Sequence, residues 1–222
     1  MKGSLLLTIL IVFHLTSCAP KPLFTSNVAP TEIRDLVVFE PISYISLIKK
    51  GDKMEFSDTL SNISKKLWLN VVEQNQYRLP VHSYFLGNDD YTKAQLQDEI
   101  RLLFEKVESL DKFYSIPLPP MIKSQLDLSE NRFGMLTVTS GFTRRKGNMT
   151  GQMLKSIGIG VLTLGMVVPM PVTAHSNVYV MILDNELDEV IYYKESSMPE
   201  SQPLKEKTLH RQLDYLYKNY LW

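Results

Sequence analysis

Apolar residues recur three and four positions apart in three parts of the chain, which is the spacing of one buried face of an α-helix. The pattern predicts helices over residues 57–74, over about twenty residues that begin at the capping box of Thr92 and Gln95, and over residues 204–220. Ser57 is a suitable N-cap for the first helix. The predicted apolar faces are Leu60, Ile63, Leu67 and Val71, widened by Trp68 and Val72; Leu96, Ile100, Leu103, Val107 and Leu110; and Leu209, Leu213, Leu216 and Tyr220. A fourth, short helix is expected near residues 121–126, after a proline cluster.

Short runs of β-branched and aromatic residues predict strands between these helices. Residues 36–39 and 133–142 are expected as strands, and residues 178–183 and 190–193 as an antiparallel hairpin. Residues 42–48 either continue the first strand past a proline bulge or form a loop, and Pro80 limits residues 77–85 to an edge strand. In residues 133–142, Leu136 and Val138 should lie on one face and Met135 and Thr137 on the other. This order predicts an α+β fold, with a mixed and mainly antiparallel sheet on which helices pack.

The amino terminus has the pattern of an export signal. Lys2 precedes an apolar run from Leu5 to Leu15, which is too short for a lasting membrane span. Leu15, Thr16 and Ser17 then precede Cys18, and this junction resembles the bacterial lipobox. The alternative is an ordinary secretory leader in which Cys18 is incidental.

The resemblance to bacterial lipoproteins implies that Leu15, Thr16 and Ser17 are recognised by the lipoprotein signal peptidase. Cys18 would then carry a diacylglycerol and become the first mature residue, with residues 1–17 removed. Two or three acyl chains, such as palmitate, hold a protein stably at a membrane. Ala19 resembles the pattern of lipoproteins that move to the outer membrane, so we expect an anchor there, with the protein facing the periplasm. Residues 18–34, which contain three prolines, are predicted to be a lipidated tether that buries little surface, and residues 35–222 a single domain.

The composition excludes several classes of protein. Twenty-four basic residues balance twenty-four acidic ones in 222 residues, so no net charge would attract nucleic acid, and we expect no nucleic-acid partner. Cys18 is the single cysteine, which excludes a disulfide framework and an iron–sulfur site.

An apolar insert near residues 155–173 interrupts the predicted strands. No charged residue occurs between Lys155 and Asp184, and Pro169 ends the most apolar part, which is too short to cross a bilayer. The insert could pack in the domain core, against a neighbouring subunit or against the membrane. Its predicted interface or membrane contacts are Ile157, Ile159, Val161, Leu162, Leu164 and Met166.

No catalytic or metal-binding motif emerges. Asp184, Glu186 and Asp188 match positions of a calcium loop, but Glu189 stands where its sharp turn requires glycine, so a hairpin turn is expected instead. His82, His175 and His210 lack the spacing of metal ligands. We therefore expect no metal, no cofactor and no enzymatic activity.

The order of elements resembles the soluble domain shared by the TolB amino-terminal domain, the curli-secretion lipoprotein and the lipoprotein activator of penicillin-binding proteins. The residues that carry the likeness are 36–39 before the Ser57 helix, 77–79, 136–138, and 179–184 followed by 190–193. The resemblance implies a non-catalytic envelope module that binds other envelope proteins or forms a homo-oligomer. The alternatives are an envelope hydrolase acting on peptidoglycan or polysaccharide, and a component of an outer-membrane export complex.

Overall fold

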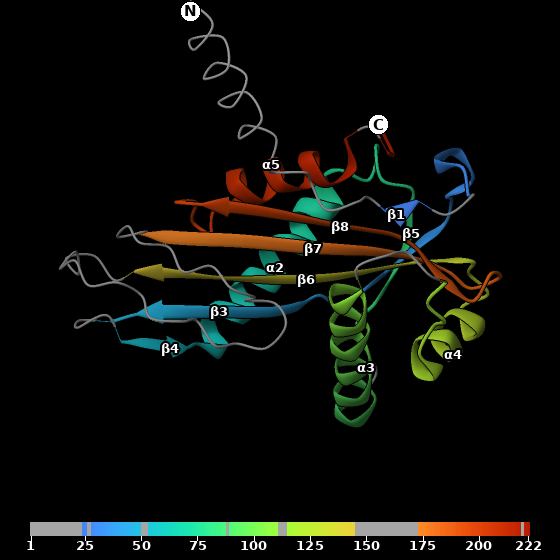
Figure 1. Cartoon of the computed structure of the whole chain (residues 1–222), viewed down its shortest axis with the longest axis horizontal. Helices are drawn as coiled ribbons and strands as arrows, with labels where there is room; N and C mark the ends of the chain where they lie inside the picture. The colour runs from blue at the N-terminus through green and yellow to red at the C-terminus, as the bar shows by residue number, and fades with distance from the viewer. Residues whose placement is uncertain are drawn as a thin grey trace, which may run out of the picture.

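A computed structural model describes residues 24–25, 28–49, 53–87, 89–110, 115–144, 173–218 and 220–222. Within these residues, one eight-stranded sheet is covered by helices (Figure 1). Its strands are β1 (Phe24–Thr25), β2 (Leu36–Phe39), β3 (Ile42–Ile48), β4 (Met54–Phe56), β5 (Val81–Phe85), β6 (Phe133–Arg144), β7 (Ala174–Asp184) and β8 (Glu189–Pro199). The helices are the 3₁₀ turn η1 (Pro30–Glu32), α2 (Asp58–Gln74), α3 (Asp90–Ser109), α4 (Pro120–Leu128) and α5 (Glu206–Tyr217).

The centre of the sheet is the antiparallel series β6–β7–β8, and β2 and β3 lie one after the other, parallel to β6. Val38 is paired with Met135 and Ile42 with Val138, so four steps along one strand match three along the other. The extra residue is a bulge at Glu40–Pro41, where proline has no N–H to donate. The strand therefore continues past the proline, which decides between the two alternatives for residues 42–48. The predicted α+β fold with a mixed sheet is confirmed.

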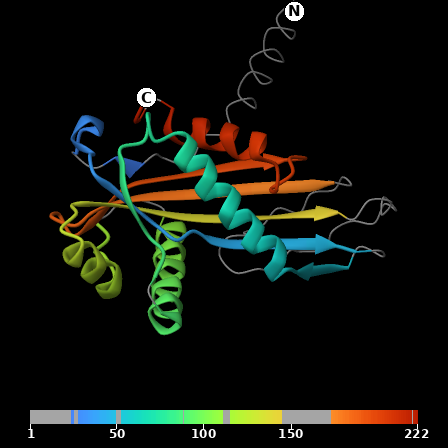
Figure 2. The ribbon, with the colours of Figure 1, turned by 180° about the vertical axis from the view of Figure 1, so that it is seen from behind.

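Each face of the sheet has its own apolar core. One core lies beneath α3 and α4 and includes Leu136 and Val138, and the other lies beneath α2 and α5 and includes Met135. Figure 2 shows α2 and α5 together on one side of the sheet. The alternation predicted for β6 is thus confirmed, because successive side chains of a strand point to opposite faces.

The apolar face predicted for α2 is wrong in part. Ile63 is 41% exposed, whereas Ser61, Ser64 and Trp68 are buried against the sheet. The Ser64 hydroxyl lies 3.1 Å from Thr139 Oγ1, and the Trp68 indole donates to Thr137 Oγ1 over 3.2 Å. Hydroxyl contacts to β6 therefore orient this helix together with the apolar contacts of Trp68, Val71 and Val72.

The other helices lie close to their predicted positions. The second predicted helix is α3, which has 20 residues and buries Leu96, Ile100, Leu103 and Val107 as expected. Its N-cap, however, is Asp89, whose carboxylate accepts from the Thr92 backbone N–H. Aspartate caps a helix as well as threonine does, so the sequence left the starting residue ambiguous.

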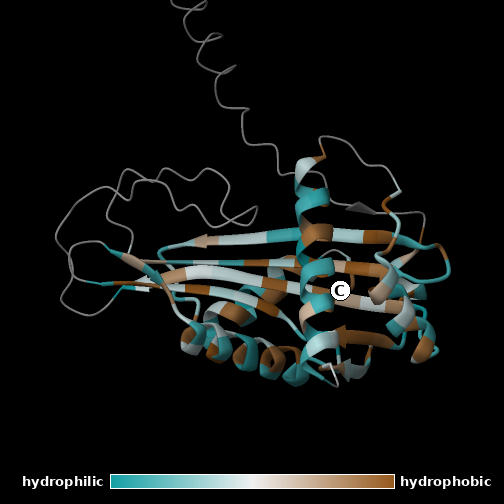
Figure 3. Ribbon diagram, turned by 90° about the horizontal axis from the view of Figure 1, so that it is seen from below, coloured by the Kyte–Doolittle hydropathy of each residue, from teal (hydrophilic) through white to brown (hydrophobic). Residues whose placement is uncertain are grey.

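Two strands extend further than their apolar runs indicate. The predicted strands 178–183 and 190–193 form an antiparallel hairpin, but β7 begins at Ala174 and β8 ends at Pro199. Figure 3 shows the change in character: the strands are hydrophobic at one end of the sheet and pale or hydrophilic at the other. We refer to these as the apolar end and the polar end of the sheet.

Replacing Gly141 in β6 tests the close packing of β6 against β7. Its φ is +154°, and a Cβ atom there would lie 2.1 Å from the His175 backbone oxygen. Since a backbone atom cannot move aside cheaply, Gly141→Ala should lower the free energy of unfolding by about 1–3 kcal/mol, measured by urea denaturation.

Gly134→Ala in the same strand is the matched control. Its Cβ would meet the ends of the Phe39 and Leu126 side chains at 3.0 and 3.1 Å, and these can shift. The control should lose less stability than Gly141→Ala, and an equal or smaller loss at Gly141 would contradict the packing described.

Candidate functional site

The site residues predicted from the sequence lie outside the described residues. This holds for Cys18, for the recognition residues Leu15, Thr16 and Ser17, and for the contacts from Ile157 to Met166 in the apolar insert. These assignments therefore stay predictions. The structure does describe the points at which both segments join the domain, and their positions limit what the segments can reach.

The chain that leads from Cys18 enters the domain at an edge of the sheet. Phe24 is paired with Tyr193 and Thr25 with Tyr192, so β1 lies beside β8 (Figure 1). Phe24 is six positions after Cys18, and six residues span at most about 20 Å. Further along, Val28 and Ile33 are buried in the core beneath α2 and α5. The expectation that residues 18–34 bury little surface is wrong for these two residues, so the segment free to act as a tether is shorter than predicted.

The apolar insert joins the polar end of the sheet. Thr143 near the end of β6 is paired with Ala174 at the start of β7, so the two ends of the intervening segment lie side by side. The turn between β7 and β8 lies at the opposite, apolar end. Any contact made by the insert thus starts from one end of the molecule, and contacts of the β7–β8 turn from the other.

A buried histidine lies next to the attachment of the insert. The His175 ring is stacked on Phe142 at 6.1 Å between centroids, and its Nε2 lies 2.6 Å from Asn177 Oδ1. Because an amide oxygen can only accept, Nε2 donates and Nδ1 carries the lone pair. Burial lowers the pKa of His175, and the hydrogen bond to Asn177 opposes this in part. The ring is therefore held neutral near pH 7.

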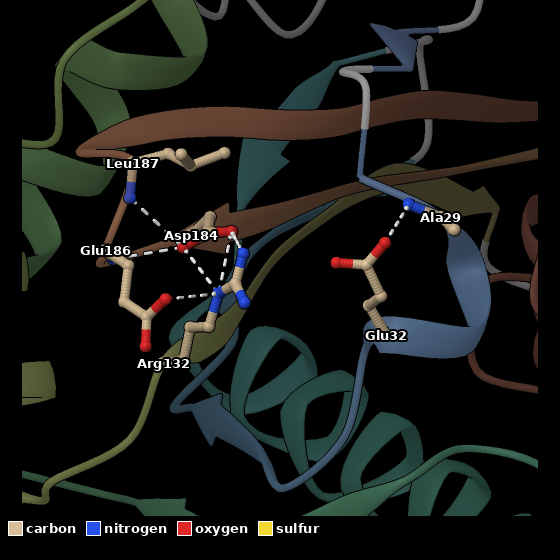
Figure 4. Close-up of polar contacts among 6 residues, drawn as sticks. All are labelled: Ala29, Glu32, Arg132, Asp184, Glu186 and Leu187. Carbon is tan, nitrogen blue, oxygen red and sulfur yellow. Dashed lines mark hydrogen bonds and ion pairs between the residues drawn. The ribbon is translucent and has the colours of Figure 1, made fainter.

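Asp184, which matches a position of a calcium loop, takes part in an ion pair instead. Asp184 is fully buried at the start of the β7–β8 turn, and the Arg132 guanidinium donates to both of its oxygens over 2.8–3.1 Å (Figure 4). The backbone N–H groups of Glu186 and Leu187 also donate to Asp184 Oδ1. With its oxygens committed in this way, Asp184 is suited to fixing the turn. The preference for a hairpin turn is confirmed, although Asp184 itself is buried.

Two further hydrogen bonds attach α4 to this turn. Lys123 of α4 donates to the Asn185 carbonyl over 3.2 Å, and the Asn185 amide donates to Asp127 of the same helix over 2.7 Å.

Glu32 of η1 is drawn beside the Arg132–Asp184 pair in Figure 4, where its carboxylate accepts a hydrogen bond from the Ala29 backbone N–H. Hydrogen bonding to Asp184, with a weaker contribution from Glu32, raises the pKa of Arg132, so the guanidinium stays charged.

The other two histidines that the structure describes do not join His175. His82 lies on β5, 4.0 Å from an Asp35 oxygen, whereas His210 lies on α5, 3.0 Å from Gln74 Oε1. Among the described residues, no three His, Cys, Asp or Glu side chains are placed to hold a metal together. In the same part of the chain, no helix has the length and apolar character of a membrane span.

The fold and its junctions define an α+β domain that joins a predicted lipid anchor at the β8 edge. No known protein family and no curated protein matches the sequence.

Solved structures give distant matches. A PelC dodecamer from Paraburkholderia phytofirmans matches with a TM-score of 0.39 at 6% identity, over 86% of this chain and 92% of that chain. A second PelC dodecamer structure from that organism has a TM-score of 0.37 at 8% identity, over 87% and 89%. The LpoB C-terminal domain from Salmonella enterica has a TM-score of 0.31 at 5% identity, over 78% and 87%. At these scores and identities the matches carry no inference about function, and the group resemblance drawn from the sequence stays a prediction.

Removing one partner of the buried ion pair should be costly. Arg132→Ala leaves the Asp184 carboxylate buried without its cation, so the free energy of unfolding should fall by about 3 kcal/mol in urea denaturation. Arg101→Ala is the matched control, because Arg101 pairs with Glu105 on an exposed surface of α3. That change should cost only about 0.5 kcal/mol. Equal losses in the two variants would show that the Asp184 pair is not a structural anchor.

Protonation of His175 should make folding pH-dependent. Its pKa in the folded chain lies below the ordinary value of 6.5, so the unfolded chain takes up this proton first. This contribution to stability is present above pH 6.5 and is lost as the pH falls below that value. Urea midpoints measured between pH 7 and pH 5 should fall less steeply in His175→Gln than in the unmodified protein. Parallel curves would exclude the role assigned to this ring.

Proposed function

We propose that the protein is a lipid-anchored module of the bacterial envelope that acts through contacts with other proteins and with further copies of itself. The observation that carries the proposal is the single cysteine at the lipobox, six positions before the strand that joins the domain. A diacylglycerol on Cys18 would hold the β8 edge within about 20 Å of the membrane. Outer-membrane attachment, with the domain in the periplasm, is part of the proposal.

The contacts of the polar side chains favour binding over catalysis. Asp184 is used by Arg132 and Asn177 by His175, and Ser176 donates to Gln212 of α5 over 2.9 Å. These groups stabilise the fold, and a group held this way is poorly placed to transfer protons to a substrate. We accordingly propose that the chain is not an enzyme.

Exposed apolar residues on α3 supply a surface for protein contacts. Tyr91 and Leu102 are 78% and 53% exposed, and their separation of eleven positions places them on the same side of the helix. The end of α3 extends past the outline of the sheet in Figures 1 and 2. A projecting helix with apolar residues on its outer side suits a protein partner better than a small ligand. Ile157, Ile159, Val161, Leu162, Leu164 and Met166 are proposed as a second contact, reached from the polar end of the sheet.

Cys18→Ala tests the anchor. Without a thiol to acylate, the lipoprotein signal peptidase has no substrate, so the unprocessed chain should accumulate and the lipid-labelled form should disappear. The measurement is metabolic labelling with palmitate, followed by membrane fractionation. Ser26→Ala, a similar change downstream of the junction, should be processed and anchored normally. Processing and labelling of Cys18→Ala at the normal level would contradict the proposal.

Crosslinking in native envelopes, followed by mass spectrometry, tests the protein contacts. The anchored chain should give adducts with itself or with other envelope proteins, and these should decrease several-fold in a variant with Tyr91→Asp and Leu102→Asp. Asn62→Asp on the exposed side of α2 is the control and should leave the adducts unchanged. Absence of specific adducts from the correctly anchored chain would refute a contact-based role.

A further inference from the structure

Helix α5 carries its acidic side chains on the flank that faces α2. Glu206, His210 and Asp214 follow one another at intervals of four residues. The Gln74 amide donates to Glu206 over 2.7 Å, and Arg78 donates to Asp214 over 2.7 Å. The charge of Asp214 is therefore paired with a cation of the domain, and Glu206 accepts a hydrogen bond from a neutral amide.

The other flank of α5 is basic and faces the edge of β8. Lys207, Arg211 and Tyr215 also follow at intervals of four, and Lys218 comes directly after the helix; all four are exposed. Arg211 NH2 lies 3.5 Å from Ser201 Oγ, just beyond the end of β8.

Lys194 extends this basic surface onto the strand itself. It donates to the Tyr215 carbonyl over 2.6 Å, and its ammonium lies 4.5 Å from the centre of the Tyr215 ring. We call Lys194, Lys207, Arg211, Tyr215 and Lys218 the basic stripe. The stripe thus has four cations and one half-exposed tyrosine, and the exposed acids nearest to them in the sequence are Glu206 and Asp214, of which Asp214 is paired with Arg78.

The entry point of the chain indicates what covers this surface. β1 is paired with Tyr192 and Tyr193, the two residues directly before Lys194. If Cys18 is acylated, as the proposed function requires, its sulfur lies at the level of the lipid headgroups. The six positions from Cys18 to Phe24 can then hold Lys194 no further from the headgroups than about 20–25 Å. The basic stripe is close to a membrane before it makes any contact of its own.

The composition of the stripe matches a phospholipid surface. Lysine and arginine are attracted to anionic lipid phosphates, and tyrosine is enriched at the boundary between headgroups and acyl chains. We propose that the basic stripe lies on the phosphate headgroups of the membrane that holds Cys18. The acyl chains keep the protein at the membrane, and the stripe determines its orientation, with α5 and the β8 edge toward the lipid.

The orientation can be measured with a fluorophore on an introduced cysteine, because acylation removes the thiol of Cys18. Ser201→Cys lies beside Arg211, and Ser129→Cys lies at the exposed end of α4 on the other face of the sheet. The full acylated chain is reconstituted into vesicles of phosphatidylcholine and phosphatidylglycerol that contain a headgroup-attached nitroxide quencher. Quenching at position 201 should exceed quenching at position 129 by about threefold, and salt near 1 M, where the Debye length is about 3 Å, should remove most of the difference.

Charge reversal identifies the cause of the orientation. Lys207→Glu with Arg211→Glu should abolish the difference between positions 201 and 129 while the protein still floats with the vesicles. The control, Lys66→Glu with Lys106→Glu, makes the same change in net charge on α2 and α3 and should preserve the difference. Circular dichroism verifies that both double variants are folded.

The outcomes separate this proposal from the proposed function. A chain that is not acylated and does not float with vesicles refutes the lipid anchor. A chain that floats but is quenched equally at both positions, or is unaffected by reversal at Lys207 and Arg211, refutes the membrane contact alone. Crosslinks from position 201 to an envelope protein, without quenching by lipid, would assign the stripe to a protein partner and would also overturn the proposal.

Discussion

Burial of β7 on both faces is the constraint on which the rest of the structure depends. Every residue from Ala174 to Asp184 is buried, including those whose side chains are polar. A buried polar group without a partner costs roughly 1–3 kcal/mol, so each of these side chains must find one. Ser176 is bonded to Gln212 of α5 and Asp184 to Arg132 before β6. The requirement for partners therefore locks a distant helix and a neighbouring strand to the same central element.

This constraint also explains why the two ends of the sheet differ. At the apolar end, side chains such as Ile182 and Tyr192 fill the core, and the ion pair of Asp184 fixes the turn. At the polar end, serines and threonines such as Ser43 of β3, Thr139 of β6 and Ser176 of β7 are paired by hydroxyl and amide contacts instead. Hydroxyl pairs such as Ser64–Thr139 allow α2 to approach the sheet closely, because their side chains are short. The insert joins the domain at this polar end, away from the fixed turn.

The sequence predicts the parts of the fold that rest on apolar spacing. The long helix α3, the helix after Ser57 and the strand centres all follow from it, because burying an apolar face is a local pattern with a local signal. The polar extensions of β7 and β8 have no such signal, since the partner of Ser176 is 36 positions away in the sequence. The exposure of Ile63 was missed for the same reason: the surface beneath α2 is set by Thr137 and Thr139 of a different segment. Pairing of β1 with β8 depends likewise on residues far apart in the chain.

The features of the candidate site likewise include some that the sequence predicts and others that only the structure shows. The lipobox is readable because its four residues are contiguous, whereas the Arg132–Asp184 pair joins residues 52 positions apart. The basic stripe lies between these cases, because the interval of four residues between Lys207, Arg211 and Tyr215 is visible in the sequence itself. The structure adds that Asp214 is paired with Arg78 and that Glu206 accepts a hydrogen bond from Gln74, both on the side of α2.

The positions of these surfaces agree with a module that joins a membrane to a protein partner. α5 and β8 lie along one edge of the molecule, and the free end of α3 projects from the opposite edge (Figures 1 and 2). Acyl chains on Cys18 alone would not fix the orientation of the domain, and α3 would then face the lipid for part of the time. If the basic stripe holds the β8 edge on the headgroups, the projecting end of α3 lies away from the membrane, where a partner can reach it. Orientation at the membrane and access to a partner are thus two consequences of the same placement of α5 beside β8.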